Sequence, residues 1–341
     1  MSAIGCGIVG YGYWGPNLAR TVSELEDVVL ISIADASPER RALAGRRHHG
    51  TDILASAEKL IADPRIDAVL IATPVSSHYE LASAALKAGK HVLVEKPICA
   101  SSAEAARLIA LASARNLVLM VDHTFPYTGA VRKVKDLVSS GHIGRPYYYD
   151  SVRVNLGLFQ KDVSVIWDLA VHDLSIMDFV FDFRPTAVSC TGMNHFADQP
   201  EDVAYLTLYF SDDFIAHLHV NWLSPVKLRR TLIGGSEKMI VYDDLEAYEK
   251  VRVHDKGLIV GSDNGDKEKV RQLLLRGYRS GDVWSPQIDP AEALSLELAH
   301  FVRCIQGFEV PITDGHAGHR VVCVLEAAEK SLMLRGAPVE L

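Results

Sequence analysis

The chain lacks the features that mark secreted, membrane-spanning and nucleic-acid-binding proteins. It has no CxxC pair among its five cysteines, which argues against a disulfide framework and a thiolate zinc site. Its net charge of −8 argues against nucleic acid or an anionic membrane surface as the main partner. No stretch approaches the roughly twenty apolar residues of a membrane span, and no cationic segment precedes an apolar run at the N-terminus. We therefore expect a cytoplasmic protein with reduced, buried cysteines that binds neither nucleic acid nor membrane.

The remaining composition is that of an ordinary globular protein. Hydrophobic residues make up 48% of the chain and charged residues 23%. A length of 341 residues suits two domains. Up to about residue 122, predicted strands and helices alternate, which indicates a Rossmann domain of six strands with right-handed helical crossovers. Strands are expected at 4–9, 28–34, 67–73, 91–94 and 117–121.

After residue 122 the pattern changes to an α+β type. Strands are predicted at 147–155, 188–195, 203–210, 215–222 and 228–241, and helices at 130–139, 170–181, 290–306 and 316–334. We expect residues 1–122 to form one domain and residues 123–341 a second, built on a largely antiparallel sheet. Such a sheet has one open face that can pack on another subunit, so a homodimer or homotetramer is expected. Residues 261–290 are interpreted as an insertion whose structure the pattern does not specify.

A glycine-rich turn joins the first predicted strand to the first predicted helix. It consists of Gly10, Tyr11, Gly12, Tyr13, Trp14 and Gly15. Gly10 permits the turn, Gly12 lets a pyrophosphate approach backbone amides at the helix N-terminus, and Gly15 lets the helix pack close to the strand. Asp35 ends the second strand, where a carboxylate can accept both hydroxyls of an adenosine ribose. The combination predicts a dinucleotide site, and an ordinary glycine turn is the alternative.

Asp35 also bears on which dinucleotide binds. Its negative charge would repel a 2′-phosphate, which favours NAD over NADP. Arg40 and Arg41 follow closely, and an arginine can neutralise that phosphate. The alternative for both arginines is an exposed position on the first turn of a helix after Ser37 and Pro38.

Two short segments carry residues suited to chemistry. The first, Glu95-Lys96-Pro97, follows a predicted strand, and ligands of open α/β sheets gather at the carboxyl ends of strands. Lys96 could polarise a substrate hydroxyl or help to relay its proton. The alternative is an exposed lysine paired with Glu95. Pro97 fixes the turn, and the pattern leaves its cis or trans state open.

The second segment runs from Trp167 to Asp173. Asp168 and His172 stand four apart at the start of a predicted helix, so their side chains share one face. A histidine can accept a hydroxyl proton near neutral pH, and a nearby carboxylate can orient its ring or hold a substrate hydroxyl. The alternative is that Asp168 caps the helix and His172 is an interior histidine.

Four motifs together resemble a known family. They are the sequences GYGYWGPN (residues 10–17), Ala-Thr-Pro (72–74) with His78, EKP (95–97) and WDLAVHD (167–173). Their order and spacing are similar to those of the glucose–fructose oxidoreductase, inositol dehydrogenase and rhizopine catabolism (Gfo/Idh/MocA) family. The resemblance covers the whole chain and implies an enzyme that uses NAD or NADP on a sugar, cyclitol or related hydroxyl. It implies catalytic roles for Lys96, Asp168 and His172. Many members have glycine where this chain has Ala170.

Within that family, residues 153–162 (RVNLGLFQKD) are similar to members that oxidise C3 of nucleotide-linked hexoses or hexuronates. In those members an arginine and an asparagine contact the substrate, which implies such contacts for Arg153 and Asn155. Two apart on a strand, these residues face the same side, and Arg153 could meet a carboxylate or diphosphate bidentately. The alternatives are a sheet-edge arginine and a turn asparagine. A keto-sugar reductase, a cyclitol or free-sugar dehydrogenase, and a non-catalytic NAD-binding regulator remain as rival functions.

These patterns and the resemblance define the predicted site. The cofactor-binding residues are expected to be Gly10, Gly12, Tyr13, Trp14, Gly15, Asp35, Thr73, Pro74, His78, Glu95 and Lys96. His78 is expected near the nicotinamide ribose, outside the catalytic set. The substrate-binding residues are expected to be Lys96, Arg153, Asn155, Asp168 and His172. No metal site is expected, because His217 and His219 share a strand face without an evident third ligand. Trp222 and the tyrosines at 147–149 are interpreted as lining a sheet.

Overall fold

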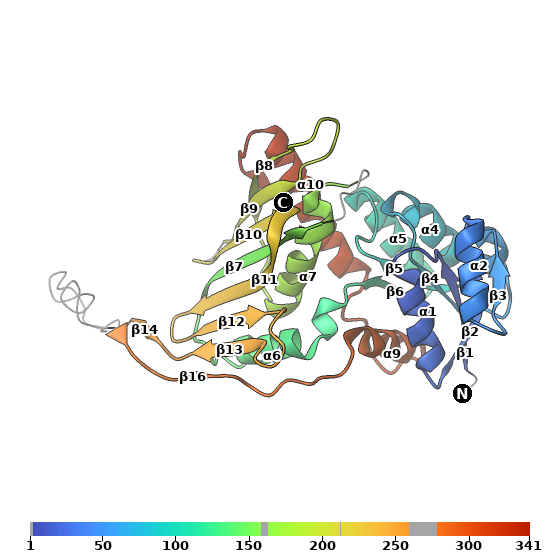
Figure 1. Cartoon of the computed structure of the whole chain (residues 1–341), viewed down its shortest axis with the longest axis horizontal. Helices are drawn as coiled ribbons and strands as arrows, with labels where there is room; N and C mark the ends of the chain where they lie inside the picture. The colour runs from blue at the N-terminus through green and yellow to red at the C-terminus, as the bar shows by residue number, and fades with distance from the viewer. Residues whose placement is uncertain (1–2, 158–162, 212, 259–277) are drawn as a thin grey trace. The chain divides into compact units, whose positions relative to one another are not determined.

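The structure is a computed structural model and describes residues 3–157, 163–211, 213–258 and 278–341 (Figure 1). Its contacts divide the chain into two compact units. The first comprises residues 1–128 and 290–326, and the second comprises residues 129–289 and 327–341. This differs from the predicted single boundary after residue 122, because helix α9 (Ala293–Ile305) buries Leu298 and Phe301 in the hydrophobic core of the first unit.

Six parallel strands form the sheet of the first unit, in the order β3-β2-β1-β4-β5-β6. They are β1 Ile4–Val9, β2 Val28–Ala34, β3 Asp52–Leu54, β4 Ala68–Ile71, β5 His91–Glu95 and β6 Leu119–Asp122. Strands β1 and β4 are buried along their whole length, as expected where helices cover both faces of a parallel sheet. The Rossmann prediction is confirmed. The strand that the predicted ranges omitted is β3, whose three residues are too few to show a pattern.

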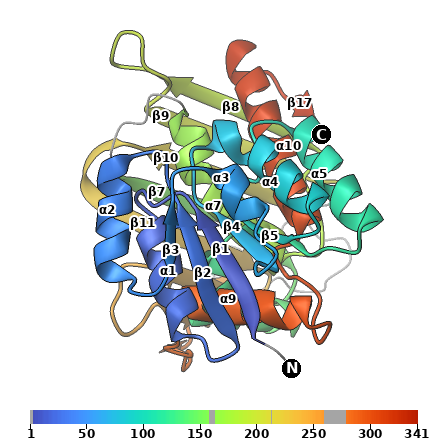
Figure 2. The ribbon, with the colours of Figure 1, turned by 90° about the vertical axis from the view of Figure 1, so that its right-hand side faces the viewer.

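Helices pack on this sheet and on one another. In the first unit they are α1 Gly15–Glu24, α2 Pro38–Arg47, α3 Ala57–Ile61, α4 His78–Lys87, α5 Ser102–Ala114 and α9, with the short turns η1 Val75–Ser77 and η2 Phe125–Tyr127. Helix α9 lies beside α1 (Figure 1, Figure 2). Helix α10 (Gly315–Met333) begins in the first unit and ends in the second. No helix among the described residues is long and apolar enough to cross a membrane.

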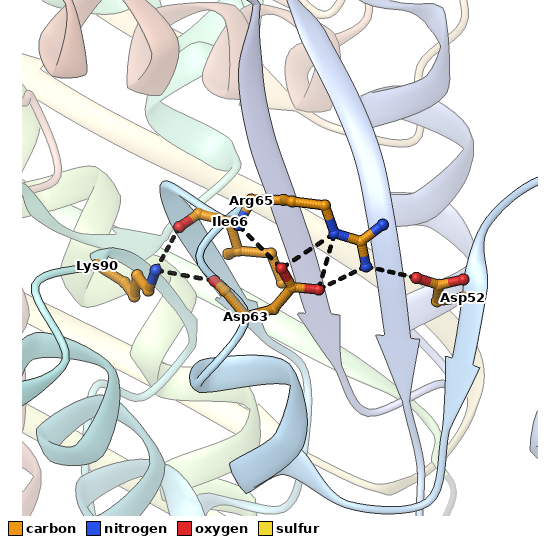
Figure 3. Close-up of polar contacts among 5 residues, drawn as sticks. All are labelled: Asp52, Asp63, Arg65, Ile66 and Lys90. Carbon is orange, nitrogen blue, oxygen red and sulfur yellow. Dashed lines mark hydrogen bonds and ion pairs between the residues drawn. The ribbon is translucent and has the colours of Figure 1, made fainter.

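Charged side chains tie together the amino ends of three strands (Figure 3). Arg65 Nη2 lies 2.6 Å from Asp52 Oδ2 at the start of β3 and 2.6 Å from Asp63 Oδ2. Lys90, just before β5, donates to the carbonyl oxygens of Ile66 at 2.6 Å and Asp63 at 3.0 Å. The Arg65 guanidinium holds the pKa of Asp63 at about 2. This network braces the amino edge of the sheet. Ligands in such folds bind at the opposite edge, at the carboxyl ends of the strands.

A nine-stranded sheet organises the second unit, in the order β16-β13-β12-β11-β7-β10-β9-β8-β17. Among the described strands of this sheet only β7 and β10 pair in parallel, so the predicted α+β domain with a largely antiparallel sheet is confirmed. The strands are β7 Pro146–Leu156, β8 Ala187–Met193, β9 Val203–Tyr209, β10 Ile215–Asn221, β11 Leu223–Gly235, β12 Met239–Asp243, β13 Val251–His254, β16 Val283–Trp284 and β17 Val339–Glu340. The short strands β14 (Gly257–Leu258) and β15 (Tyr278–Arg279) pair separately.

One predicted strand of the second unit is a hairpin. Residues 228–241 were expected to form a single strand, but β11 ends at Gly235 and β12 returns antiparallel from Met239. Glycines at 234 and 235 followed by Ser236 allow the reversal. Most of the predicted insertion at 261–290 lies outside the described residues, which resume at Tyr278.

The two faces of the large sheet differ. Helices α6 (Gly129–Ser139) and α7 (Val171–Val180) pack together, and Lys135 of α6 donates to the carbonyl oxygen of Phe179 of α7. Strand β9 alternates, with Leu206 buried and Tyr205 42% exposed. The alternation gives the sheet a buried face and an outer face, as an antiparallel sheet permits.

Candidate active site

The turn after β1 adopts a conformation that requires glycine at two positions. Gly10 has a φ of 98°, and a Cβ atom there would lie 2.4 Å from the carbonyl oxygen of Ala72. A Cβ atom on Gly15 would lie 2.2 Å from the carbonyl oxygen of Gly10. The turn therefore closes tightly, and α1 begins directly at its end with a proline in the first turn.

The N-terminus of α1 is suited to an anion. All residues of α1 are described, and neither a side-chain cap nor an acidic residue occupies its first turn. Its first N–H groups and the positive end of its dipole therefore face the turn without a competing carboxylate from the helix itself. This arrangement fits the pyrophosphate of a dinucleotide, which binds backbone N–H groups at a helix N-terminus.

Asp35 directly follows β2, and backbone amides hold both of its carboxylate oxygens. Oδ2 accepts a hydrogen bond from the N–H of Tyr11 at 2.7 Å, and Oδ1 accepts one from the N–H of Ser37 at 2.8 Å. These bonds fix the carboxylate beside the glycine turn. Each oxygen keeps a further lone pair with which it can accept a ribose hydroxyl.

The two arginines after Asp35 have different surroundings. Arg41 Nη1 donates to the carbonyl oxygens of Asp35 and Ala36, both at 2.8 Å. Arg40 Nη1 lies 3.8 Å from Asp35 Oδ2 and 3.3 Å from where a Cβ atom on Gly12 would be. Arg41 therefore braces the backbone, and Arg40 is the arginine that faces the glycine turn.

Tyr13 and Trp14 project from the same turn in different ways. Tyr13 is 86% exposed, and its ring stacks on that of Trp14 with centroids 6.4 Å apart. The indole N–H of Trp14 donates to Asp122 Oδ2 at 2.7 Å. Asp122 is the last residue of β6, and sequence reasoning missed it. Its position at the carboxyl end of an apolar strand was the signal that could have found it.

The EKP segment lies at the carboxyl end of β5, as predicted. Glu95 is the last residue of the strand, and its Oε2 accepts the backbone N–H of Lys96 at 3.2 Å. Burial, and then the neighbouring Asp122, raise the pKa of Glu95 well above its ordinary value of 4.5. The Lys96–Pro97 peptide bond is cis. Glu95 is therefore a half-buried support of the loop that carries Lys96.

His78 braces the two loops on either side of it. Its Nε2 lies 2.8 Å from the carbonyl oxygen of Thr73, and its Nδ1 lies 2.8 Å from the carbonyl oxygen of Pro97. Burial lowers the pKa of His78, although the two carbonyl oxygens favour the protonated ring. Both ring nitrogens thus contact the backbone, and the position near the nicotinamide ribose stays a prediction. The imidazole connects the segment Ala72–Pro74 with the segment Glu95–Pro97.

Asp168 and His172 lie on consecutive helical segments of different type. Residues Ile166–Ala170 form a π-helical turn, η3, and α7 follows from Val171. Such turns occur frequently at functional sites. Asp168 Oδ2 accepts the indole N–H of Trp222 at 3.1 Å. Trp222 was predicted only to line a sheet, but this buried residue holds the carboxylate that the family resemblance marks as catalytic.

Arg153 lies on β7 and makes its bidentate contact inside the protein. Its Nε lies 2.8 Å from Asp173 Oδ2 and its Nη2 lies 3.1 Å from Asp173 Oδ1, with both side chains 3% exposed. The Arg153 guanidinium, which was predicted to bind a substrate anion through two hydrogen bonds, pairs in this way with Asp173. A buried guanidinium requires such a carboxylate. Strand β7 lies between β11 and β10, so Arg153 is not at a sheet edge. Asn155 is half-buried on the same strand.

The structure brings the predicted cofactor residues to one edge of the parallel sheet. The glycine turn follows β1 and Asp35 follows β2. The segment Ala72–Pro74 follows β4, and Lys96 follows β5. Arg153, Asn155, Asp168 and His172 belong to the second unit. Residues 158–162 of the predicted substrate segment lie outside the described residues. Within the described ranges, no group of three His, Cys, Asp or Glu side chains could hold a metal ion.

A Rossmann sheet with a tight glycine turn, a helix N-terminus suited to phosphate and an acid after the second strand defines a dinucleotide-binding protein. Residues 4–123 match an oxidoreductase family with an NAD-binding Rossmann fold, and residues 131–241 match the GFO/IDH/MocA C-terminal domain. The chain therefore belongs to the Gfo/Idh/MocA family and is an NAD-binding oxidoreductase.

Several relatives match nearly the whole chain. The UDP-N-acetylglucosamine 3-dehydrogenase of Acidithiobacillus ferrooxidans is 26% identical over 93% of both chains. A solved structure of that enzyme gives a TM-score of 0.82 at 24% identity and covers 98% of this chain and 99% of its own. The myo-inositol 2-dehydrogenase of Thermotoga maritima is 22% identical over 96% of this chain and 95% of its own. The structure of an oxidoreductase from Agrobacterium radiobacter was solved with NAD+, L-tartaric acid and magnesium. It gives a TM-score of 0.80 at 20% identity and covers 99% of this chain and 98% of its own.

Proposed function

We propose that this enzyme transfers hydride between a secondary sugar hydroxyl and the nicotinamide of NAD, at C3 of a nucleotide-linked hexose or hexuronate. The observation that carries the proposal is the hydrogen bond from buried Trp222 to Asp168. It holds a carboxylate in place four residues before His172, within the region that matches the family's C-terminal domain. The relative named as a UDP-N-acetylglucosamine 3-dehydrogenase supports the choice of substrate class.

The proposed catalytic residues have distinct roles. His172 accepts the proton of the substrate hydroxyl as general base. Lys96 donates a hydrogen bond to the hydroxyl oxygen and stabilises the negative charge that develops there. Asp168, held by Trp222, positions the substrate or the imidazole. NAD, when bound, supplies the hydride acceptor.

The cofactor is proposed to bind at the carboxyl edge of the parallel sheet. The N–H groups at the start of α1 would hold the pyrophosphate, since Gly12 and Gly15 allow close approach. Asp35 would accept the adenosine-ribose hydroxyls through its remaining lone pairs. Thr73, Pro74 and the EKP segment lie at the same edge and would contact the nicotinamide half.

Two related reactions are the second candidates. The reverse reaction, reduction of a keto-sugar, would use the same residues with His172 as general acid. Oxidation of a cyclitol or free sugar is favoured by the relative named as a myo-inositol 2-dehydrogenase. Both candidates keep the roles of Lys96 and Asp168 and change only the substrate or the direction.

The first experiment measures the melting temperature of the purified enzyme with NAD, with NADP, and with each cofactor plus UDP- and dTDP-sugars. A ligand that binds only the folded state raises this temperature. We expect a rise with NAD that increases with a nucleotide sugar, and faster NADH formation from UDP-N-acetylglucosamine than from myo-inositol. Faster NADH formation from myo-inositol would favour the cyclitol reaction. Tight NAD binding without hydride transfer from any substrate would favour a non-catalytic regulator.

We also propose that the outer face of the nine-stranded sheet joins copies of the chain into a homodimer or homotetramer. Tyr205, Tyr209 and Ile215 are 42%, 38% and 47% exposed on neighbouring strands of this sheet. Exposed apolar side chains gathered on one face are typical of a subunit interface. Light scattering after size exclusion is expected to show the oligomer, and Tyr205→Glu is expected to dissociate it. A monomeric wild type would contradict this proposal.

A cytoplasmic location is proposed from the cysteines. All five are free, and four of them are buried. Free thiols persist in reducing compartments. Cell fractionation that places the native protein in an oxidising compartment would contradict this proposal.

A further inference from the structure

A chain of buried polar groups begins at the glycine turn. The indole N–H of Trp14 donates to Asp122 Oδ2 at 2.7 Å. Thr124 Oγ1 donates to the other oxygen, Oδ1, at 2.8 Å. Asp122 is 3% exposed, so its carboxylate is a fixed acceptor that determines where the indole lies.

Two further carboxyl groups lie against Asp122. Glu95 is paired with it in the register of β5 and β6, and Glu297 reaches it from α9. Glu297 is fully buried, and the Thr124 hydroxyl that faces it donates its hydrogen to Asp122. Asp122 thus faces both Glu95 and Glu297, and three ionised carboxylates so close together would repel one another strongly. A proton on one of them converts this repulsion into a hydrogen bond.

Glu297 is the group best placed to carry that proton. Burial, and then Asp122 and Glu95, raise the pKa of Glu297 well above its ordinary value of 4.5. The pKa of Glu95 is also raised, but Lys96 and a backbone N–H oppose that rise. The groups facing the cluster are therefore Glu95 and Lys96 from the end of β5, Asp122 from β6 and Thr124 after it, which is neutral.

We propose that Glu297 is a positioning residue for the NAD-binding turn: in its protonated form it donates a hydrogen bond to Asp122, which in turn holds the indole of Trp14. The relay connects α9, far along the chain, with the loop that receives the cofactor. Its hydrophobic surroundings support this role, because Leu294 and Leu298 of α9 belong to the core cluster against which Trp14 packs. The proposal requires NAD binding and does not depend on which sugar is the substrate.

The test compares NAD dissociation constants of variants that keep or remove the donor. Glu297→Gln retains a donor to Asp122, and we expect its dissociation constant to stay within about twofold of wild type. Glu297→Leu removes the donor and is expected to weaken NAD binding about tenfold, as for the loss of a hydrogen bond to a charged group. Glu309→Gln serves as the matched carboxyl-to-amide control, since Glu309 pairs with Arg303 at the end of α9.

A double mutant distinguishes positioning from general destabilisation. If Glu297 acts through the indole, Trp14→Phe combined with Glu297→Leu weakens NAD binding no more than Trp14→Phe alone. Effects that multiply would overturn the proposal. So would unchanged NAD affinity in Glu297→Leu.

An independent measurement covers the case in which Glu297→Leu does not fold. Infrared difference spectra of the protein without NAD at about pH 8 are expected to show the carbonyl stretch of a protonated carboxylic acid. This band is expected to disappear in Glu297→Gln and to persist in Glu309→Gln. A wild type without the band, or a band that survives Glu297→Gln, would show that Glu297 does not carry the proton.

Discussion

The guanidinium of Arg153 forms a buried bidentate ion pair with Asp173, the residue that follows His172. Strand β7 and helix α7 are thus joined directly beside the proposed general base. The pair connects the strand that carries Arg153 to the helix that carries His172, and a substrate contact for Arg153 stays a prediction. This pair gives the first of five predictions.

Replacing Arg153 by Leu leaves the Asp173 carboxylate buried without its partner. We expect the free energy of unfolding to fall by about 3–5 kcal/mol, measured by denaturant titration. Arg153→Lys keeps the charge but loses the fork, and kcat is expected to fall while NAD affinity stays the same. Arg145→Lys alters an exposed pair with Asp213 and should change stability by less than about 0.5 kcal/mol. Equal effects at the two arginines would contradict the role of the buried pair.

Trp222→Phe keeps most of the ring and removes the N–H that holds Asp168. Because Asp168 would lose one donor, we expect kcat to fall about tenfold with the NAD dissociation constant unchanged. Steady-state kinetics and fluorescence titration measure the two quantities. Trp284→Phe, at a partly exposed site on β16, is the control and should leave both unchanged. An unchanged kcat in Trp222→Phe would remove the basis for the positioning of Asp168.

His172→Asn removes the proposed general base. Turnover is expected to fall by roughly 10²–10⁴-fold, the usual contribution of such a group. NAD binding should persist, because the glycine turn and Asp35 are untouched. His49→Asn, at an exposed site after α2, is the control for a histidine change. Retention of most of the turnover would transfer the role of base to another residue.

Asp35 and Arg40 are expected to oppose each other in cofactor choice. Asp35→Ser removes the charge that repels a 2′-phosphate, so the preference for NAD over NADP should fall about tenfold or more. Arg40→Ala should weaken NADP binding and leave NAD binding nearly unchanged, because the Arg40 guanidinium lies 3.8 Å from Asp35. Arg41→Ala tests the alternative, that the arginine on the backbone carbonyls sets the preference. The dissociation constants of NAD and NADP, measured for each variant, show whether Arg40 or Arg41 sets the preference.

The pH dependence of stability is expected to reveal Glu297. Above its ordinary pKa of 4.5 the unfolded chain has lost this proton, while the folded protein retains it because burial raises the pKa. Stability therefore decreases as pH rises from 4.5 toward the raised value. Glu297→Gln should reduce this alkaline loss in melting temperatures measured across pH, and the part that remains is expected to come from Glu95, whose pKa is also raised.

Glu309 provides a control of opposite sign. Hydrogen bonds from Arg303 and His300 lower its pKa, so its contribution is present above 4.5 and is lost as the pH falls. Glu309→Gln should therefore alter only the acid side of the profile. An alkaline slope that Glu309→Gln removes, or that Glu297→Gln leaves intact, would contradict the assignment.

Local patterns were sufficient for much of the fold. The glycine turn, the apolar strand β4 and the alternating strand β9 follow from steric and hydrophobic rules that act over a few residues. Strand β3 escaped prediction because three residues show no period. The hairpin of β11 and β12 was predicted as one strand because an otherwise continuous pattern outweighed the turn signal of two glycines.

The partners of the site residues could not be predicted in the same way. Trp14 with Asp122 and Trp222 with Asp168 are 108 and 54 residues apart in sequence. Glu297 lies still farther from the turn that it is proposed to support. No local pattern indicates which buried donor will meet which acceptor, because that choice depends on how distant segments pack.

The sequence by itself determined most of the strands and helices, the dinucleotide turn and the candidate residues Lys96, Asp168 and His172. Only the tertiary structure decided that Arg153 serves Asp173 and that α9 belongs to the first unit. The physical reason is that periodicity and turn chemistry are properties of neighbouring residues. Buried charges and polar groups must instead find partners wherever the folded chain brings them together.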